Sequence, residues 1–158
     1  MKYFYNYGGD NMRLWHQSLI KYLPNKQLLG QHRELCALRG LGFGRKHRIV
    51  DYVFEHPYYF LYQFHLIVMS EMKKRNFLVN YLWYDCHYRG KRLGFDNSIF
   101  TKKCDYNEVI YTEHNLYYLK ECLINLNSKD IYLKISRKCS LFQTLYLNNL
   151  LDYVEIID

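Results

Sequence analysis

Apolar residues recur at helical spacing in three long stretches of this chain, and clear strand alternation is scarce. Helices are predicted over Lys26–Arg39, about Tyr59–Asn76, and from an N-cap at Thr112 to about Asn127. We therefore expect a mainly α fold, a single compact domain of about three main helices with long basic loops. At 158 residues the chain is long enough for one domain around one core.

The two ends of the chain differ from this central pattern. Residues 1–11 show no period and are expected to be an extension or a mis-assigned start, followed by the domain over residues 12–134. Residues 135–158 are expected to be a C-terminal extension, in which LFQTLYLNNLLDYV could add a helix. The start lacks a signal peptide, and the longest apolar run, near Tyr58–Met69, is too short for a membrane span. A cytoplasmic protein without a membrane partner is expected.

Basic residues gather in the first third of the sequence. The net charge is +7, and eight basic residues stand against two acidic ones between Arg13 and Asp51. This excess fits a partner rich in phosphate. An ordinary solvated basic face is the alternative, although the clustering favours nucleic acid. The 18 tyrosines reflect either codon bias in an AT-rich genome or stacking on bases.

Cysteines and histidines give little sign of a metal site. The five cysteines are odd in number and form no C-x-x-C pair, so neither a zinc site nor a disulfide framework is expected. Four histidines lack a metal-ligand spacing with a carboxylate and are interpreted as core or polar-contact residues: His16, His32, His65 and His87. No metal and no other cofactor is predicted.

Glu34 lies in the first predicted helix, on a face that carries no lysine. At 100° per residue, its neighbours within about 60° are two amides, two small residues and a leucine: Gln27, Gln31, Gly30, Ala37 and Leu38. A carboxylate beside two amides and a hollow could accept a polar group of a ligand. The alternative is a solvated surface glutamate, and the positions around the helix by themselves favour this alternative. Arg33 could flank the hollow or pair with Glu34.

A glycine-rich loop follows this helix and leads into a basic run. Gly40, Gly42 and Gly44 precede Arg45-Lys46-His47-Arg48. Backbone without side chains can approach a phosphate closely, and the cations can neutralise it. The motif of a nucleotide-binding P-loop is absent.

Four stretches in this order resemble the pyrimidine-dimer DNA glycosylase family, the phage-type endonuclease V group: MRLWHQSLIKYLPNKQLLGQHRELCALRG, GFGRKH, EMKKRNF and the late helix after TEHNL. The similarity covers about residues 12–134 and is close to a bacterial branch that begins MRLWH. The phage enzyme is more distant. It has a histidine shortly before the Arg-Glu pair, where this chain has Asn25-Lys26-Gln27, and its aromatic C-terminal tail has no clear counterpart here.

The resemblance implies an endonuclease V-like fold and a DNA base-excision repair glycosylase with AP-lyase activity. In this family an N-terminal α-amine attacks C1′ of the damaged nucleotide, expels the base and leaves an imine, and a glutamate assists β-elimination. The amine would belong to Met12 and the glutamate is Glu34. DNA contacts are expected from Arg13, Arg33, Arg39, Arg45, Lys46 and His47. The implied partner is double-stranded DNA of the nucleoid that contains damaged pyrimidines or abasic sites. The protein is expected to be a monomer.

The chemistry of an α-amine suits this mechanism. Its ordinary pKa of about 7.7–8 leaves a useful fraction neutral at cellular pH, unlike a lysine near 10.4. A neutral amine forms an imine readily. A nearby carboxylate can accept protons during ring opening and elimination.

The position of Met12 within the chain limits this prediction, because its nitrogen is an amide in the sequence as written. Translation could begin at Met12, since Gly8-Gly9 can be encoded by a GGAGG ribosome-binding sequence. Arg13 would then prevent removal of the methionine. Otherwise the chain begins at Met1, and the amine folds back or the activity is lost. A non-catalytic nucleic-acid-binding relative is the second hypothesis, and a helical partner-binding protein with an incidental basic face is the third.

Overall fold

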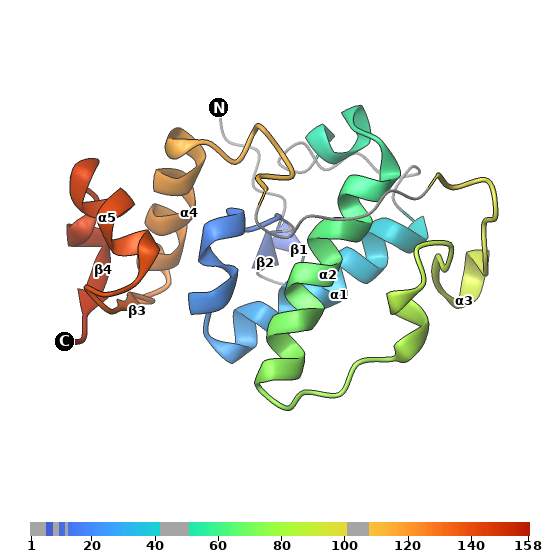
Figure 1. Cartoon of the computed structure of the whole chain (residues 1–158), viewed down its shortest axis with the longest axis horizontal. Coiled ribbons are helices and arrows are strands. Elements are labelled where there is room, and N and C mark those ends of the chain that lie inside the picture. The colour runs from blue at the N-terminus through green and yellow to red at the C-terminus, as the bar shows by residue number, and fades with distance from the viewer. Residues whose placement is uncertain (1–5, 8–9, 12, 42–50, 101–107) are drawn as a thin grey trace.

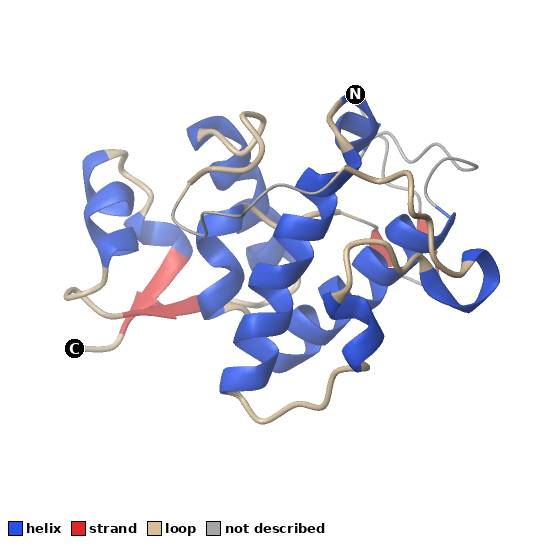
Figure 2. Ribbon diagram, turned by 45° about the vertical axis from the view of Figure 1, so that its right-hand side comes forward, coloured by secondary structure: helices blue, strands red, loops and turns tan. Residues whose placement is uncertain are grey.

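A computed structural model of the chain describes residues 6–7, 10–11, 13–41, 51–100 and 108–158 (Figure 1). This part of the chain is mainly helical, as expected, with a few very short strands (Figure 2). The elements are, in order, β1 (Asn6–Tyr7), β2 (Asp10–Asn11), η1 (Gln17–Tyr22), α1 (Asn25–Leu41), η2 (Asp51–Glu55), α2 (Tyr58–Lys74), η3 (Tyr81–Tyr84), α3 (Gly90–Leu93), α4 (Leu116–Ser128), β3 (Leu133–Ile135), α5 (Ser140–Leu147), η4 (Leu151–Tyr153) and β4 (Val154–Ile156).

Helices α1 and α2 pack together at the centre of the molecule (Figures 1 and 2). The predicted apolar stripe of α2 is buried, as the helical spacing indicated: Leu61, Phe64, Val68 and Met72. Leu28, Leu35 and Leu38 of α1 are also buried. Removing these side chains from water provides the main driving force for the pairing of the two helices. Both predicted helices are confirmed to within a few residues at each end.

The start of α4 corrects one detail of the sequence prediction. The helix begins at Leu116, and Asn115 caps it by accepting a hydrogen bond from the Tyr118 N–H at 2.9 Å. Thr112 was expected at this position. It lies instead in a preceding turn, in which the N–H of the buried His114 donates to the carbonyl of Tyr111 at 3.0 Å. The helix therefore starts about one turn later than predicted.

The C-terminal residues form a small α/β layer against α4, shown at the left of Figure 1. β3 and β4 are parallel, with Leu133 opposite Val154, and α5 connects them. Helix α5 confirms the helix expected in this stretch, whereas three-residue strands carry too little alternation to be predicted. Residues 134 and 135, on the two sides of the expected domain boundary, are neighbours within β3.

No helix in the described ranges is both long enough and apolar enough to cross a membrane.

Candidate active site

The segment Arg13–His16 runs through the interior of the molecule between side chains of α1 and α4. Arg13, Leu14 and Trp15 are all buried. The Trp15 N–H donates to Gln31 Oε1 on α1 at 2.6 Å. The Leu14 carbonyl accepts a hydrogen bond from the hydroxyl of Tyr118 on α4. Side chains of two helices therefore fix the backbone that directly follows residue 12.

Glu34 lies next to this backbone. Gln31 Nε2 donates one hydrogen bond to the Arg13 carbonyl at 2.8 Å and another to Glu34 Oε2 at 3.1 Å. Because the two acceptors share one nitrogen, they lie within about 6 Å of each other. The expectation that Gln31 and Glu34 share a helix face is confirmed. Met12, the expected source of the amine, lies outside the described residues.

Arg33 is exposed, and its guanidinium lies beside Gly30. A Cβ placed on Gly30 would stand 3.8 Å from Arg33 Nη2, which is ordinary van der Waals contact. The space that the glycine leaves beside the helix is thus bordered by the Arg33 guanidinium. This arrangement fits the interpretation that Arg33 flanks the region of Glu34, and its exposure leaves it accessible to a phosphate.

Arg13 does not occupy the exposed position expected of a DNA contact. Only 5% of its surface is exposed, and its guanidinium carbon lies 5.3 Å from the centre of the Trp15 ring. Burial raises the pKa values of Tyr118 and Cys122 on α4, and the positive charge of Arg13 opposes this rise. The side chain points inward, because the apolar residues that follow it draw the whole segment into the core. The structure gives Arg13 an anchoring position in place of the predicted phosphate contact.

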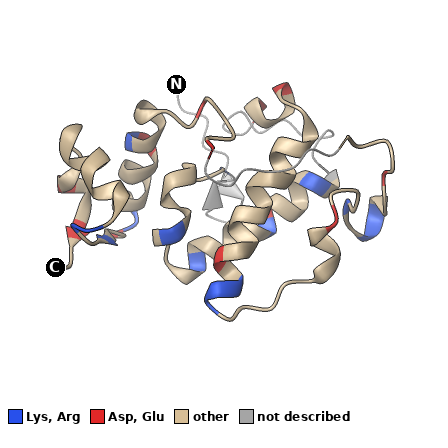
Figure 3. Cartoon of the chain, in the orientation of Figure 1, with Lys and Arg blue, Asp and Glu red and all other residues tan. Residues whose placement is uncertain are grey.

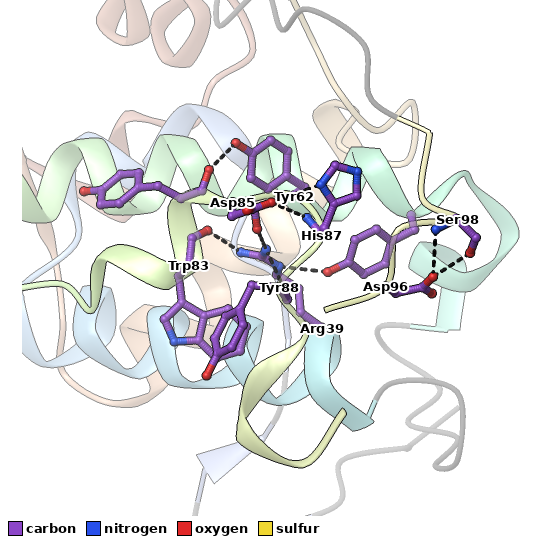
Figure 4. Close-up of polar contacts among 10 residues, drawn as sticks. Arg39, Tyr62, Trp83, Asp85, His87, Tyr88, Asp96 and Ser98 are labelled. Atoms are coloured by element: carbon purple, nitrogen blue, oxygen red, sulfur yellow. Dashed lines mark hydrogen bonds and ion pairs between the residues drawn. The ribbon is translucent and has the colours of Figure 1, made fainter. Parts of the chain in front are cut away.

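Arg39 also departs from the prediction of a DNA contact, because it has no exposed surface. Its guanidinium donates to the Tyr58 hydroxyl, to His65 Nδ1 and to three backbone carbonyls at 2.8–3.0 Å: those of Trp83, Asp85 and Tyr88. Figure 4 shows Trp83, Asp85 and Tyr88 around the Arg39 side chain. A phosphate could reach Arg39 only if these bonds broke, so we replace the predicted contact with a structural role.

The bonds of Arg39 organise the chain from η3 to α3. The Arg39 guanidinium donates hydrogen bonds to the backbone carbonyls of residues 83, 85 and 88. In return, Arg89 Nε donates to the Arg39 backbone carbonyl at 2.8 Å. A Cβ on Gly40 would stand 3.0 Å from the Arg89 carbonyl oxygen, so a larger residue here would require the Arg89 backbone to shift by a few tenths of an ångström. The sequence predicted a loop at Gly40, whereas the residue lies in the last turn of α1.

Exposed cations are also present on α3 and at the end of α2 (Figure 3). Lys91 and Arg92 belong to the one-turn helix α3, within a stretch expected to be a loop. Lys73 and Lys74 lie in the last turn of α2, as predicted. Arg45, Lys46 and His47 lie outside the described residues.

A partly buried cluster of His32, Cys36 and His65 was missed in the sequence. Their ligand-type atoms lie within 4.8 Å of one another. The signal was present, because His32 and Cys36 are four residues apart on α1, but His65 comes from α2 and only the packing brings it close. The histidines are in polar contact, as interpreted, with His32 Nδ1 2.8 Å from His65 Nε2.

The hydrogen bonds of this cluster do not fit a metal ion. Arg39 can only donate, so its 2.9 Å bond to His65 Nδ1 requires a lone pair there and places the His65 proton on Nε2. That Nε2–H then donates to His32 Nδ1, and neither nitrogen is available as a ligand. Burial raises the pKa of the Cys36 thiol to about 11, which keeps it protonated at neutral pH. The two histidines and the thiol are therefore uncharged and are linked by hydrogen bonds.

A second buried polar cluster surrounds His114. Gln17 N–H donates to His114 Nδ1 at 3.0 Å, which leaves the proton on Nε2, 2.7 Å from the Tyr52 hydroxyl oxygen. Burial lowers the pKa of His114 to about 3, so the ring is neutral at physiological pH. No spacing in the sequence pointed to this cluster, because its members come from three distant segments.

These contacts define a helical protein in which a carboxylate lies beside the peptide that follows residue 12. Residues 12–85 match the model of the protein family described as pyrimidine dimer DNA glycosylase. This stretch, which contains Gln31 and Glu34, is therefore similar to the pyrimidine dimer DNA glycosylase family, the family that the motifs indicated. The family implies DNA glycosylase activity on pyrimidine dimers in general, with damaged DNA as substrate. No curated protein and no solved structure matches the chain.

Proposed function

We propose that this protein is a DNA base-excision repair glycosylase with AP-lyase activity, acting on damaged pyrimidines in duplex DNA. The observation that carries the proposal is the pair of hydrogen bonds from Gln31 to the Arg13 carbonyl and to Glu34. They support the proposal because Glu34 and the Arg13 carbonyl share Gln31 as their hydrogen-bond donor.

In the proposed reaction the neutral α-amine of Met12 attacks C1′ of the damaged nucleotide. The C1′–base bond breaks, the base leaves with the bonding electrons and takes up a proton, and the sugar opens to an imine with the amine. Glu34 then accepts a proton during the opening and the elimination at C2′, and the 3′ phosphate leaves. Water hydrolyses the imine and restores the amine.

The reaction requires access to a sugar inside a duplex, and the charges of the protein support that contact. The net charge is +7, and exposed Arg33 lies next to Glu34 in the sequence. A damaged base leaves the stack at lower cost than a normal one. Arg33, with Arg45, Lys46 and His47, is proposed to hold the phosphates while the base is displaced.

Borohydride trapping on duplex DNA with an abasic site tests this function directly. Protein that begins at Met12 is expected to give a covalent adduct and to nick the strand. Acetylation of its N-terminus should abolish both, because an amide nitrogen cannot form an imine. Protein that begins at Met1 provides the matched comparison, and intact mass of the native protein shows which form occurs. If the Met12 form gives neither adduct nor nicking, the proposal is wrong.

Substitution of Glu34 separates the two chemical steps. Glu34→Gln keeps the size of the side chain and removes the base, so some adduct should still be trapped while nicking fails. Loss of the adduct and of nicking to the same degree would show that Glu34 acts in a different step from elimination.

A non-catalytic DNA-binding relative of the same fold is the second candidate. It is favoured by one observation, that the Met12 nitrogen is an amide in the chain as written. Salt-dependent duplex binding without an adduct would support this candidate. No duplex binding at low salt would leave a partner-binding protein with an incidental basic face.

A further inference from the structure

Gln31 uses both donors of its amide nitrogen and one lone pair of its amide oxygen in one place. The side chain has no exposed surface. Oε1 accepts from the Trp15 N–H at 2.6 Å, and the two N–H groups of Nε2 go to the Arg13 carbonyl at 2.8 Å and Glu34 Oε2 at 3.1 Å. A glutamine amide has two donors on its nitrogen, and both are occupied.

These partners allow only one orientation of the amide. If the group were turned by 180°, its oxygen would face a carbonyl and a carboxylate, and its nitrogen would face the Trp15 N–H. All three contacts would then be repulsive, so the network itself fixes which atom is nitrogen. Because Gln31 is buried in the packed helix α1, the amide cannot move without breaking the backbone contacts of residues 13 and 15.

We propose that Gln31 is the positioning residue of the active site. It holds the Glu34 carboxylate in a fixed position relative to the backbone segment that carries the reacting amine. This inference rests on the proposed function. Gln31 does not touch the substrate. It acts through Glu34 and through the backbone of Arg13, and one rigid amide fixes both.

The same bond also bears on the chemistry of Glu34. A hydrogen bond donated to a carboxylate favours its ionised form. Glu34 is thereby kept ready to accept a proton, and its Oε2 is oriented by Gln31. A displacement of about 1 Å in such a group can cost about 100-fold in rate, because the reacting atoms lose their alignment.

The test compares Gln31→Leu and Gln31→Glu with Gln143→Glu, an exposed glutamine on α5 that matches the change of charge. The variants are made in the N-terminal form that gives the borohydride adduct. Trapping counts the active sites, so the single-turnover nicking rate can be expressed per site at saturating abasic duplex. This normalisation removes the effect of a smaller folded fraction, which a merely structural role would produce.

For Gln31→Leu we expect a 10- to 100-fold lower nicking rate per site. Its affinity for the duplex should stay within about twofold of the wild-type value, because Gln31 is buried. The acidic limb of its pH profile should be displaced to higher pH. Gln31→Glu should recover part of the rate at the acidic end, where the introduced carboxyl group is protonated and can again donate one hydrogen bond. Gln143→Glu should behave as wild type. The carboxyl carbon signal of Glu34, followed by NMR in the full chain, should titrate at higher pH in Gln31→Leu than in wild type.

An unchanged rate per site in Gln31→Leu, with active wild-type protein, overturns this inference and leaves the proposed function standing. An unchanged Glu34 titration also overturns it, because the donated bond would then have no effect on the carboxylate. If the wild-type protein itself neither traps nor nicks, the proposed function fails, which is a different result.

Discussion

Arg33 and Arg39 lie less than two turns apart on α1, but Arg33 is exposed and Arg39 is completely enclosed. Six residues on a helix rotate the side chain by 600°, or 240° net, so the two arginines point to different sides. Arg33 borders Gly30 at the surface, whereas Arg39 points into the space between α1, α2 and η3. Two residues of the same type on one helix thus have an exposed position and a structural position.

Replacement of Arg39 is expected to be strongly destabilising. Arg39→Met leaves three backbone carbonyls and His65 Nδ1 without their donor in a buried site. The expected loss in the free energy of unfolding is about 3–5 kcal/mol. Arg33→Met, the matched exposed change, should cost no more than about 0.5 kcal/mol. Urea unfolding of both variants measures the difference, and similar losses would contradict the role given to Arg39.

Replacement of Arg33 is expected to weaken DNA binding without unfolding the protein. If Arg33 contacts a phosphate, Arg33→Ala should lower the slope of log K against log salt by about 1, equally for damaged and undamaged duplexes. Fluorescence anisotropy over a series of salt concentrations measures this slope. Lys138→Ala, an exposed cation in the C-terminal layer, is the control and should leave the slope unchanged. Equal effects of the two substitutions would argue against a specific contact at Arg33.

Stability is expected to fall as the pH is lowered below neutrality. The pKa of His114 is about 3 in the folded protein and near 6.5 in the unfolded chain. The unfolded state therefore takes up a proton as the pH falls through 6.5, and the folded state does so only near 3. This loss amounts to about 2 kcal/mol between pH 7 and pH 5 for His114 alone. Burial lowers the pKa of His16, His32 and His65 as well, in the same direction.

The contribution of His114 can be isolated with His114→Gln, which keeps an acceptor but cannot titrate. Urea midpoints at pH 7 and pH 5 should differ less in this variant than in wild type. Equal differences in the two proteins would mean that His114 is protonated at similar pH in the folded and unfolded states.

Addition of Co²⁺ should leave the His32–Cys36–His65 cluster unchanged. Arg39 requires the His65 proton on Nε2, and the thiol with a pKa of about 11 is protonated. No thiolate-to-cobalt charge-transfer band is expected at pH 7, and the melting temperature should not rise. A band that appears in wild type and is lost in Cys36→Ser would show that the cluster does bind a metal and that Arg39 can move aside.

Helical periodicity and turn residues were sufficient to predict α1, α2 and the helix in the C-terminal stretch. These are local properties, because the burial of a stripe and the effect of Pro24 or Pro57 act within a few residues. The same local pattern correctly placed Gln31 on the face of Glu34. The ordered motifs from Met12 onward also identified the family over residues 12–85.

The burial of Arg13 and Arg39 could not be predicted from the sequence, because an arginine in a basic stretch has the same local pattern whether it faces water or the core. Only the tertiary structure supplies the carbonyls of Trp83, Asp85 and Tyr88, 44 to 49 residues away, that make burial of Arg39 favourable. Likewise, the sequence alone determined that Glu34 and Gln31 share a helix face. The fold decided that Gln31 also donates to the Arg13 carbonyl, because that contact depends on the packing of a segment 18 residues away from Gln31.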